Sequence, residues 1–200
     1  MEKFRQIVRS YTREIYEIPI SKVLIKLGLT PNMITFIGLV ITIFGSYFIY
    51  QGEFLIGGII VAFGTILDSI DGAMARLTKN ESVFGDLLDS VIDRYGEATI
   101  FVALACYYLF NSLDKTAVLL CIISMLCSQL ISYVRAKSES LQIENKSGFF
   151  TRVERSVILI FFLIISQPLY ALYILSIGTL ASSIWTVSYT HLTLPTNREV

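Results

Sequence analysis

Long apolar segments, separated by short polar connections, follow one another along most of the chain. Each segment is near or above the roughly 20 residues that an α-helix needs to cross the hydrocarbon core of a bilayer. The pattern therefore predicts an all-α integral membrane protein with six transmembrane helices. The six predicted spans cover residues 31–50, 54–77, 83–110, 114–137, 149–166 and 168–187.

The two ends of the chain depart from this pattern. Residues 1–27 intersperse apolar with basic side chains, which predicts an amphipathic juxtamembrane helix in the membrane interface and not a signal peptide. Thr30 and Pro31 are the residue types favoured at an N-cap and at a first helical position, so the first span should begin there. We expect residues 28–187 to form one six-helix domain and residues 188–200 to be a tail that is disordered or foreign to the natural chain.

Composition and charge refine the class. Of 200 residues, 54% are hydrophobic and 16% are charged, which is typical of a membrane protein and excludes an ordinary soluble domain. Lysine and arginine are frequent before the first predicted span, between the second and third, and between the fourth and fifth, whereas the other connections contain only Lys115. The positive-inside rule then places both termini on the cytoplasmic side of the cell membrane in a multi-pass protein. We expect no nucleic-acid partner.

Four aspartates lie at the polar ends of the second and third predicted spans, where a free carboxylate is costly. A charged side chain at the centre of a membrane helix costs about 2.5–3.5 kcal/mol on translocon scales, and less near an interface. Asp68 and Asp71 share one helix face, as do Asp89 and Asp93. If residues 79–81 form the tip of a helical hairpin, the two pairs meet at the same depth. Converging carboxylates suit Mg²⁺, with Mn²⁺ as the alternative, and four negative charges balance two such ions.

The residues from Asp71 to Asp93 read D-G-x2-A-R-x8-G-x3-D-x3-D, which resembles the signature of the CDP-alcohol phosphotransferases at every fixed position. Asp68 matches a further aspartate that family members carry three residues upstream. The resemblance implies that Asp68, Asp71 and Asp89 ligate metal. Asp93 would be the general base and a further ligand. The positive-inside rule, applied above, also places these aspartates on the cytoplasmic side.

The same resemblance implies a CDP-lipid substrate, either CDP-diacylglycerol or CDP-archaeol, and release of CMP when an acceptor hydroxyl attacks the lipid-linked phosphorus. It also implies a homodimer. The element P-N-x-x-T at 31–35 resembles a segment near the nucleotide site of the family, and small residues let a ligand approach the backbone. The residues expected to contact the CDP-lipid are Asn32, Thr35, Gly72, Ala75, Arg76 and Gly85.

Four cations gather where the fourth span ends and the fifth begins. Arg135, Lys137, Arg152 and Arg155 would suit a phosphate dianion, because arginine binds phosphate through two hydrogen bonds and lysine binds it as a point charge. Together with the flanking sequence they resemble the inositol-phosphate branch of the family, so we expect inositol 1-phosphate as the acceptor. The positive-inside rule alone would also place cations here.

Two alternatives for the function stay open, and the role of one further acid is undecided. Glycerol 3-phosphate is a rival acceptor for the same chemistry. A divalent-cation transporter would also carry carboxylates within the membrane, although all four acids here lie in the cytoplasmic half of the predicted spans. Asp86 shares the stripe of Asp89 and Asp93 but is no fixed motif position, so we expect it to be solvated or to orient a ligand residue.

Overall fold

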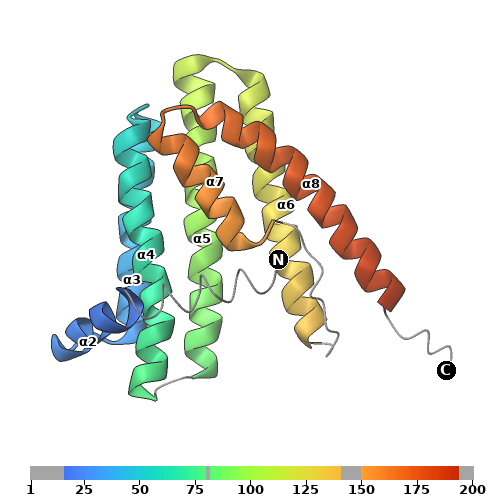
Figure 1. Cartoon of the computed structure of the whole chain (residues 1–200). Coiled ribbons are helices and arrows are strands. Elements are labelled where there is room, and N and C mark those ends of the chain that lie inside the picture. Colours follow the sequence, from blue (N-terminus) through green and yellow to red (C-terminus); the bar gives the residue numbers. More distant parts are fainter. Residues whose placement is uncertain (1–15, 80–81, 141–149, 194–200) are drawn as a thin grey trace.

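The computed structural model describes residues 16–79, 82–140 and 150–193, and every regular element in these ranges is helical (Figure 1). The prediction of an all-α chain is therefore confirmed for the described residues. The helices are α2 (Ile18–Lys26), α3 (Pro31–Tyr50), α4 (Phe54–Thr78), α5 (Val83–Tyr107), a π-helical turn (Tyr108–Ser112), α6 (Lys115–Ser140), α7 (Arg152–Ile164) and α8 (Pro168–Thr193).

Four of these helices are long and apolar enough to cross a membrane, namely α3, α4, α6 and α8. The prediction of six spans is not confirmed, because α5 and α7 do not meet this standard. Helix α5 has 25 residues, but its first half is rich in charged side chains. Helix α7 has only 13 residues, which give it a length of about 20 Å against a hydrocarbon core of about 30 Å.

Local signals explain why α7 is shorter than the predicted span at 149–166. Thr151 and Glu154 form a capping box that begins the helix, with the Glu154 carboxylate accepting from the Thr151 backbone N–H at 2.7 Å. Ser166 has a φ of 57°, a left-handed conformation that ends the helix just before Pro168. As a result, α7 begins about halfway along α5 and not at the end of the bundle (Figure 1).

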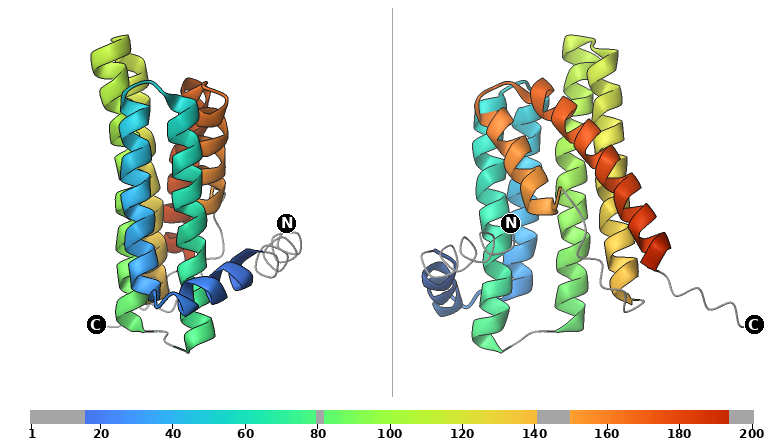
Figure 2. Two further views of the ribbon diagram at one scale, coloured as in Figure 1. Left: turned by 90° about the vertical axis from the view of Figure 1, so that its left-hand side faces the viewer. Right: turned by 45° about the vertical axis from the view of Figure 1, so that its right-hand side comes forward.

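The structure tests the predictions for the two ends of the chain to different extents. Of the amphipathic helix predicted for 1–27, the described part is α2, which packs against α4 and leaves the bundle sideways (Figure 2). Residues 1–15 lie outside the described residues, so the interfacial helix stays a prediction. At the other end, α8 continues to Thr193, beyond the predicted end of the span, because neither proline nor glycine interrupts the chain there.

Small residues allow α3 and α4 to pack closely. A Cβ at Gly64 would lie 3.0 Å from the Gly38 carbonyl oxygen, and a Cβ at Gly57 would lie 2.8 Å from that of Gly45. Only glycine lets two helical backbones approach in this way. Helices α3 and α5 also pack together, while α6 pairs with α8 and α7 lies against α4 and α8 (Figures 1 and 2). Close packing of α3 on α4 brings the start of α3 up to the polar end of α4.

Candidate active site

Three of the four predicted aspartates converge at the hairpin between α4 and α5. Asp68, Asp71 and Asp89 each offer a carboxylate oxygen, and these oxygens lie within 4.8 Å of one another. Asp71 is buried and the other two are half-buried. Such a group of hard oxygen atoms fits a divalent ion such as Mg²⁺ or Mn²⁺, and mutual repulsion among the carboxylates would be relieved by it.

The ends of the two helices set this geometry. Lys79 adopts a left-handed conformation, with a φ of 53°, and ends α4. Ser82 then caps α5, its side-chain oxygen accepting from the Gly85 N–H at 3.0 Å. The hairpin is therefore tight, and one carboxylate of α5 faces two carboxylates of α4.

The start of α3 meets the same hairpin. Thr30 accepts from the Met33 N–H at 3.4 Å, which confirms the predicted N-cap, so the P-N-x-x-T element forms the first turn of α3. The Thr35 hydroxyl donates to Asp71 Oδ2. Asn32 is exposed, and its Oδ1 would lie 3.4 Å from a Cβ at Gly85. Asn32 and Thr35, expected to contact the CDP-lipid, thus lie beside the acidic residues.

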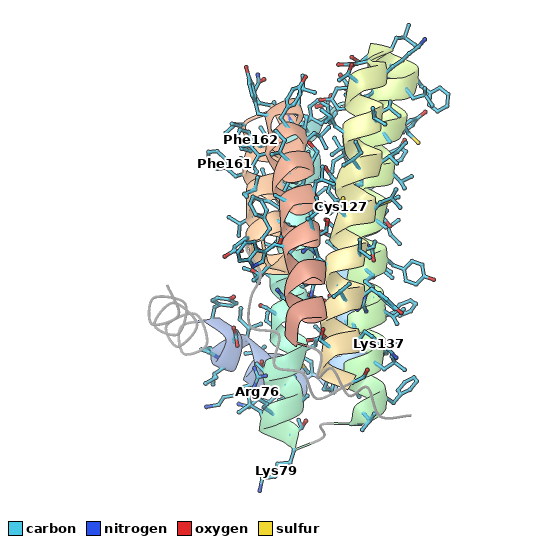
Figure 3. All side chains as sticks on the ribbon, turned by 90° about the vertical axis from the view of Figure 1, so that its right-hand side faces the viewer. Arg76, Lys79, Cys127, Lys137, Phe161 and Phe162 are labelled. Atoms are coloured by element: carbon cyan, nitrogen blue, oxygen red, sulfur yellow. The ribbon has the colours of Figure 1, made fainter. Side chains whose placement is uncertain are left out.

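The other small motif residues leave one side of α4 open. Among the described residues, a Cβ at Gly72 would meet only Arg76 Nη1 within 4 Å, at 3.5 Å, and Ala75 is half-buried. Arg76 is exposed, and its Nη2 lies 3.8 Å from Glu17 Oε2 just before α2. Figure 3 shows Arg76 and Lys79 at the same end of the bundle as Lys137.

Arg152, the first residue of α7, links the fourth aspartate, Asp93, to Asp68 of the converging group. Its Nη1 donates to Asp93 Oδ2, and its Nη2 donates to Asp68 Oδ2 at 2.8 Å. The second oxygen of Asp93, Oδ1, is buried and has no hydrogen-bond partner among the described residues. A buried, unpaired carboxylate oxygen is costly unless a ligand satisfies it. Asp93 therefore offers one oxygen to a molecule bound beside it.

A cavity of about 190 Å³ adjoins Asp93. It has room for a small polar molecule, since on the same measure of volume about 10–15 Å³ suffices for one water. Three of the four cations predicted to bind phosphate line it, whereas Lys137 is exposed and does not. The charged residues that line the cavity are Arg94, Arg135, Arg152 and Arg155 with Asp93 and Glu97.

Sequence reasoning missed Arg94 and Glu97. Glu97 lies one helical turn after Asp93, a spacing that places both on one face of α5 and could have identified it. Its carboxylate accepts from Arg155 Nε at 2.8 Å and from Arg155 Nη2 at 3.1 Å. Asp86, by contrast, is exposed and lies outside the group of converging aspartates.

The chain is similar to a known protein family and to several of its members. A family model described as CDP-alcohol phosphatidyltransferase matches residues 28–187. The phosphatidylinositol phosphate synthase of Mycobacterium tuberculosis (strain ATCC 25618 / H37Rv) is 32% identical over 143 residues, which are 71% of this chain and 66% of that protein. The match thus spans about two thirds of that relative's length. An archaetidylinositol phosphate synthase of Pyrococcus horikoshii is 41% identical over 120 residues, 60% of this chain and 61% of that one.

The fold of this chain is also similar to that of solved structures over nearly its whole length. The crystal structure of the Mycobacterium tuberculosis phosphatidylinositol phosphate synthase with CDP-DAG bound superposes with a TM-score of 0.85 at 26% identity, covering 92% of this chain and 98% of that one. Its complex with manganese and citrate gives a TM-score of 0.84 at the same identity, covering 92% of each chain.

The converging carboxylates predict a specific loss of metal affinity. Asp89→Asn removes one charge from the group, so its Mn²⁺ affinity, measured by titration with detection by electron paramagnetic resonance, should fall at least about tenfold. Asp86→Asn, on the same helix but exposed, is the matched control and should bind Mn²⁺ like the wild type. Equal affinities in the two variants would contradict this metal site.

Proposed function

The chain belongs to the CDP-alcohol phosphatidyltransferase family, and we propose that it transfers the phosphatidyl or archaetidyl group of a CDP-lipid to a hydroxyl of inositol 1-phosphate, with release of CMP. Membership makes the protein a transferase, and its apolar helices make it an integral membrane protein. The observation that carries the choice of a phosphorylated acceptor is the arginine-lined cavity next to Asp93. The similarity to phosphatidylinositol and archaetidylinositol phosphate synthases favours inositol 1-phosphate over glycerol 3-phosphate.

We assign the metal site to the carboxylates of the hairpin. Asp68, Asp71 and Asp89 would hold Mg²⁺, with Mn²⁺ as an alternative and Asp93 as a further ligand of a second ion. When bound, the metal supplies positive charge that stabilises the diphosphate of the CDP-lipid and the departing CMP. The close approach of the carboxylate oxygens supports this assignment, as does the manganese complex of the mycobacterial relative.

Asp93 is our candidate for the general base. Arg152 holds one of its carboxylate oxygens, while the other is buried without a hydrogen-bond partner among the described residues and adjoins the cavity. In the proposed step the acceptor hydroxyl gives its proton to Asp93 and its oxygen forms a bond to the lipid-linked phosphorus. The bond from that phosphorus to the CMP oxygen breaks, and CMP leaves with the electron pair. No covalent enzyme intermediate is required.

For the CDP-lipid, we propose the face of the hairpin formed by the start of α3 and the open side of α4. Asn32 and Thr35 are placed to orient the nucleotide beside the acids, with Thr35 hydrogen-bonded to Asp71. Gly72, Ala75 and Gly85 would let the diphosphate approach the helix backbones. Arg76 would add positive charge at the edge of this face.

The charge of the cavity supports a phosphorylated acceptor. Four arginines line it against two carboxylates, which leaves an excess of two positive charges for a phosphate that carries nearly two negative charges at neutral pH. The positive-inside rule explains cations in solvent, but it does not explain a guanidinium that is 2% exposed, as Arg155 is. We propose that Arg135, Arg152 and Arg155 bind the phosphate, with Lys137 attracting it from the rim.

We further propose that α5 and α7 complete a bundle of six membrane helices that functions as a homodimer. The acidic hairpin would face the cytoplasm, where soluble acceptors are available. Arg76, Lys79 and Lys137 lie toward the same end of the bundle in Figure 3, which supports this orientation.

The acceptor can be identified by measuring CMP release. Purified protein with Mg²⁺ and either CDP-diacylglycerol or CDP-archaeol should release CMP with inositol 1-phosphate, but not with free inositol or serine, because these two lack the phosphate. Chelation with EDTA should abolish the reaction. Release with glycerol 3-phosphate alone would keep the chemistry and replace the acceptor, whereas release with serine or free inositol alone would contradict the role of the arginines.

Removing the proposed base should separate turnover from metal binding. Asp93→Asn should lower the rate of CMP release by about 100-fold or more, because general-base catalysis contributes roughly 10²–10⁴-fold. Mn²⁺ should still bind through the three converging aspartates. The matched control Asp86→Asn should turn over at the wild-type rate, and a wild-type rate for Asp93→Asn would exclude Asp93 as the base.

A further inference from the structure

Glu97 and Arg155 form a two-point ion pair between α5 and α7. Arg155 Nε and Nη2 each donate to a different carboxylate oxygen of Glu97, at 2.8 and 3.1 Å. The exposed fractions of the two side chains are only 2% for Arg155 and 11% for Glu97. A two-point contact of this kind fixes the plane of a guanidinium as well as its position. Glu97 therefore sets the direction in which the rest of the Arg155 head group points.

A third hydrogen bond holds the guanidinium from the opposite side. Arg155 Nη1 donates to the Phe150 carbonyl oxygen at 3.2 Å. Phe150 has a φ of 67°, which is rare for a residue other than glycine. Its ring packs against Gly178 of α8, where any Cβ would collide with it. The packing of Phe150 on α8 thus holds the carbonyl that Arg155 contacts.

These contacts leave part of Arg155 available to a ligand. A guanidinium has five N–H groups, of which Glu97 and Phe150 take three, so one remains on each Nη. Arg155 and Glu97 both line the cavity that contains Arg135 and Arg152. The remaining N–H groups therefore belong to a side chain that is rigidly held at the wall of this cavity.

We propose that Glu97 is the positioning residue for the acceptor phosphate, holding Arg155 so that its two remaining N–H groups point at the phosphate oxygens. This inference rests on the function proposed above and deepens it. Glu97 does not contact the reacting atoms; it acts through Arg155. Without Glu97 the guanidinium would lose two of its three supports and would have to be ordered again at each binding event, at a cost in acceptor affinity.

The competing explanation is that the ion pair only fastens α5 to α7. A buried ion pair can have that purely structural role, and breaking it would then lower stability and affect all kinetic constants together. The proposal instead predicts that the KM for the acceptor changes while the KM for the CDP-lipid does not. The two explanations are therefore separable by steady-state kinetics.

The test compares Glu97→Gln and Glu97→Asp with Glu53→Gln, an exposed glutamate at the start of α4 that serves as the control. Glu97→Gln should raise the KM for inositol 1-phosphate by about tenfold, the usual effect of weakening hydrogen bonds to a charged group. Its KM for the CDP-lipid and its Mn²⁺ affinity should stay within about twofold of the wild type. Glu97→Asp keeps the charge on a shorter side chain, so it should raise the acceptor KM by less, and it provides the measurement if Glu97→Gln does not fold.

A double variant shows whether Glu97 acts through Arg155. Once Arg155→Ala has raised the acceptor KM, adding Glu97→Gln should raise it no further, because residues in one network are not additive. If the two substitutions instead raise the acceptor KM independently, so that their factors multiply in the double variant, the proposal is overturned. An unchanged acceptor KM in an active Glu97→Gln protein would also overturn it. If the wild type turns over neither inositol 1-phosphate nor glycerol 3-phosphate, the proposed function itself is wrong and this inference with it.

Discussion

The concentration of negative charge at the hairpin between α4 and α5 is the constraint on which the rest of the structure depends. Carboxylate oxygens of Asp68, Asp71 and Asp89 converge at the polar end of a helix that is apolar enough to cross a membrane. Like charges so close together repel one another strongly in a medium of low dielectric constant. They persist only where hydrogen bonds and positive charges surround them.

Two neighbouring helices contribute a hydrogen bond and a positive charge to these carboxylates. Helix α3 contributes the Thr35 hydroxyl, and it can do so because glycines bring its backbone close to α4. Helix α7 contributes Arg152, which contacts Asp68 and Asp93 at once. Because α7 begins halfway along the bundle, its first turn delivers both Arg152 and Arg155 to the level of the acids and not to the bulk solvent. The short length of α7 is thus what joins a metal site to a phosphate site in our account.

The sequence predicted the bounds of the helices well where the apolar segment and the signals at the helix ends agree. Helix α3 spans the predicted 31–50 because Thr30 and Pro31 define its start, and α4 ends within one residue of the prediction. The length of α7 was overestimated, because the capping box at Thr151 and the left-handed Ser166 cut an apolar segment short. Hydrophobic pattern alone does not register such ends.

Part of the candidate site could likewise be predicted from the sequence, and part of it could not. Family membership, inferred from the motif that ends at Asp93, is confirmed. Helical periodicity and the assumed hairpin predicted that four acids meet, and three of them converge within 4.8 Å. The pairing of Glu97 with Arg155 joins residues 58 positions apart in the chain, and only tertiary packing reveals it. The roles of the individual site residues stay predictions until they are tested.

In the function proposed here, the acids and the arginine-lined cavity form a single site, so that the acceptor phosphate binds next to the metal. The most direct measurement is the ³¹P relaxation of inositol 1-phosphate in the presence of protein loaded with Mn²⁺, whose unpaired electrons accelerate relaxation only at short range. We expect strong relaxation enhancement with the wild type, and its loss both in Arg155→Ala and on replacement of Mn²⁺ by Mg²⁺. Saturable binding of inositol 1-phosphate to the Mn²⁺-loaded protein without relaxation enhancement would contradict it.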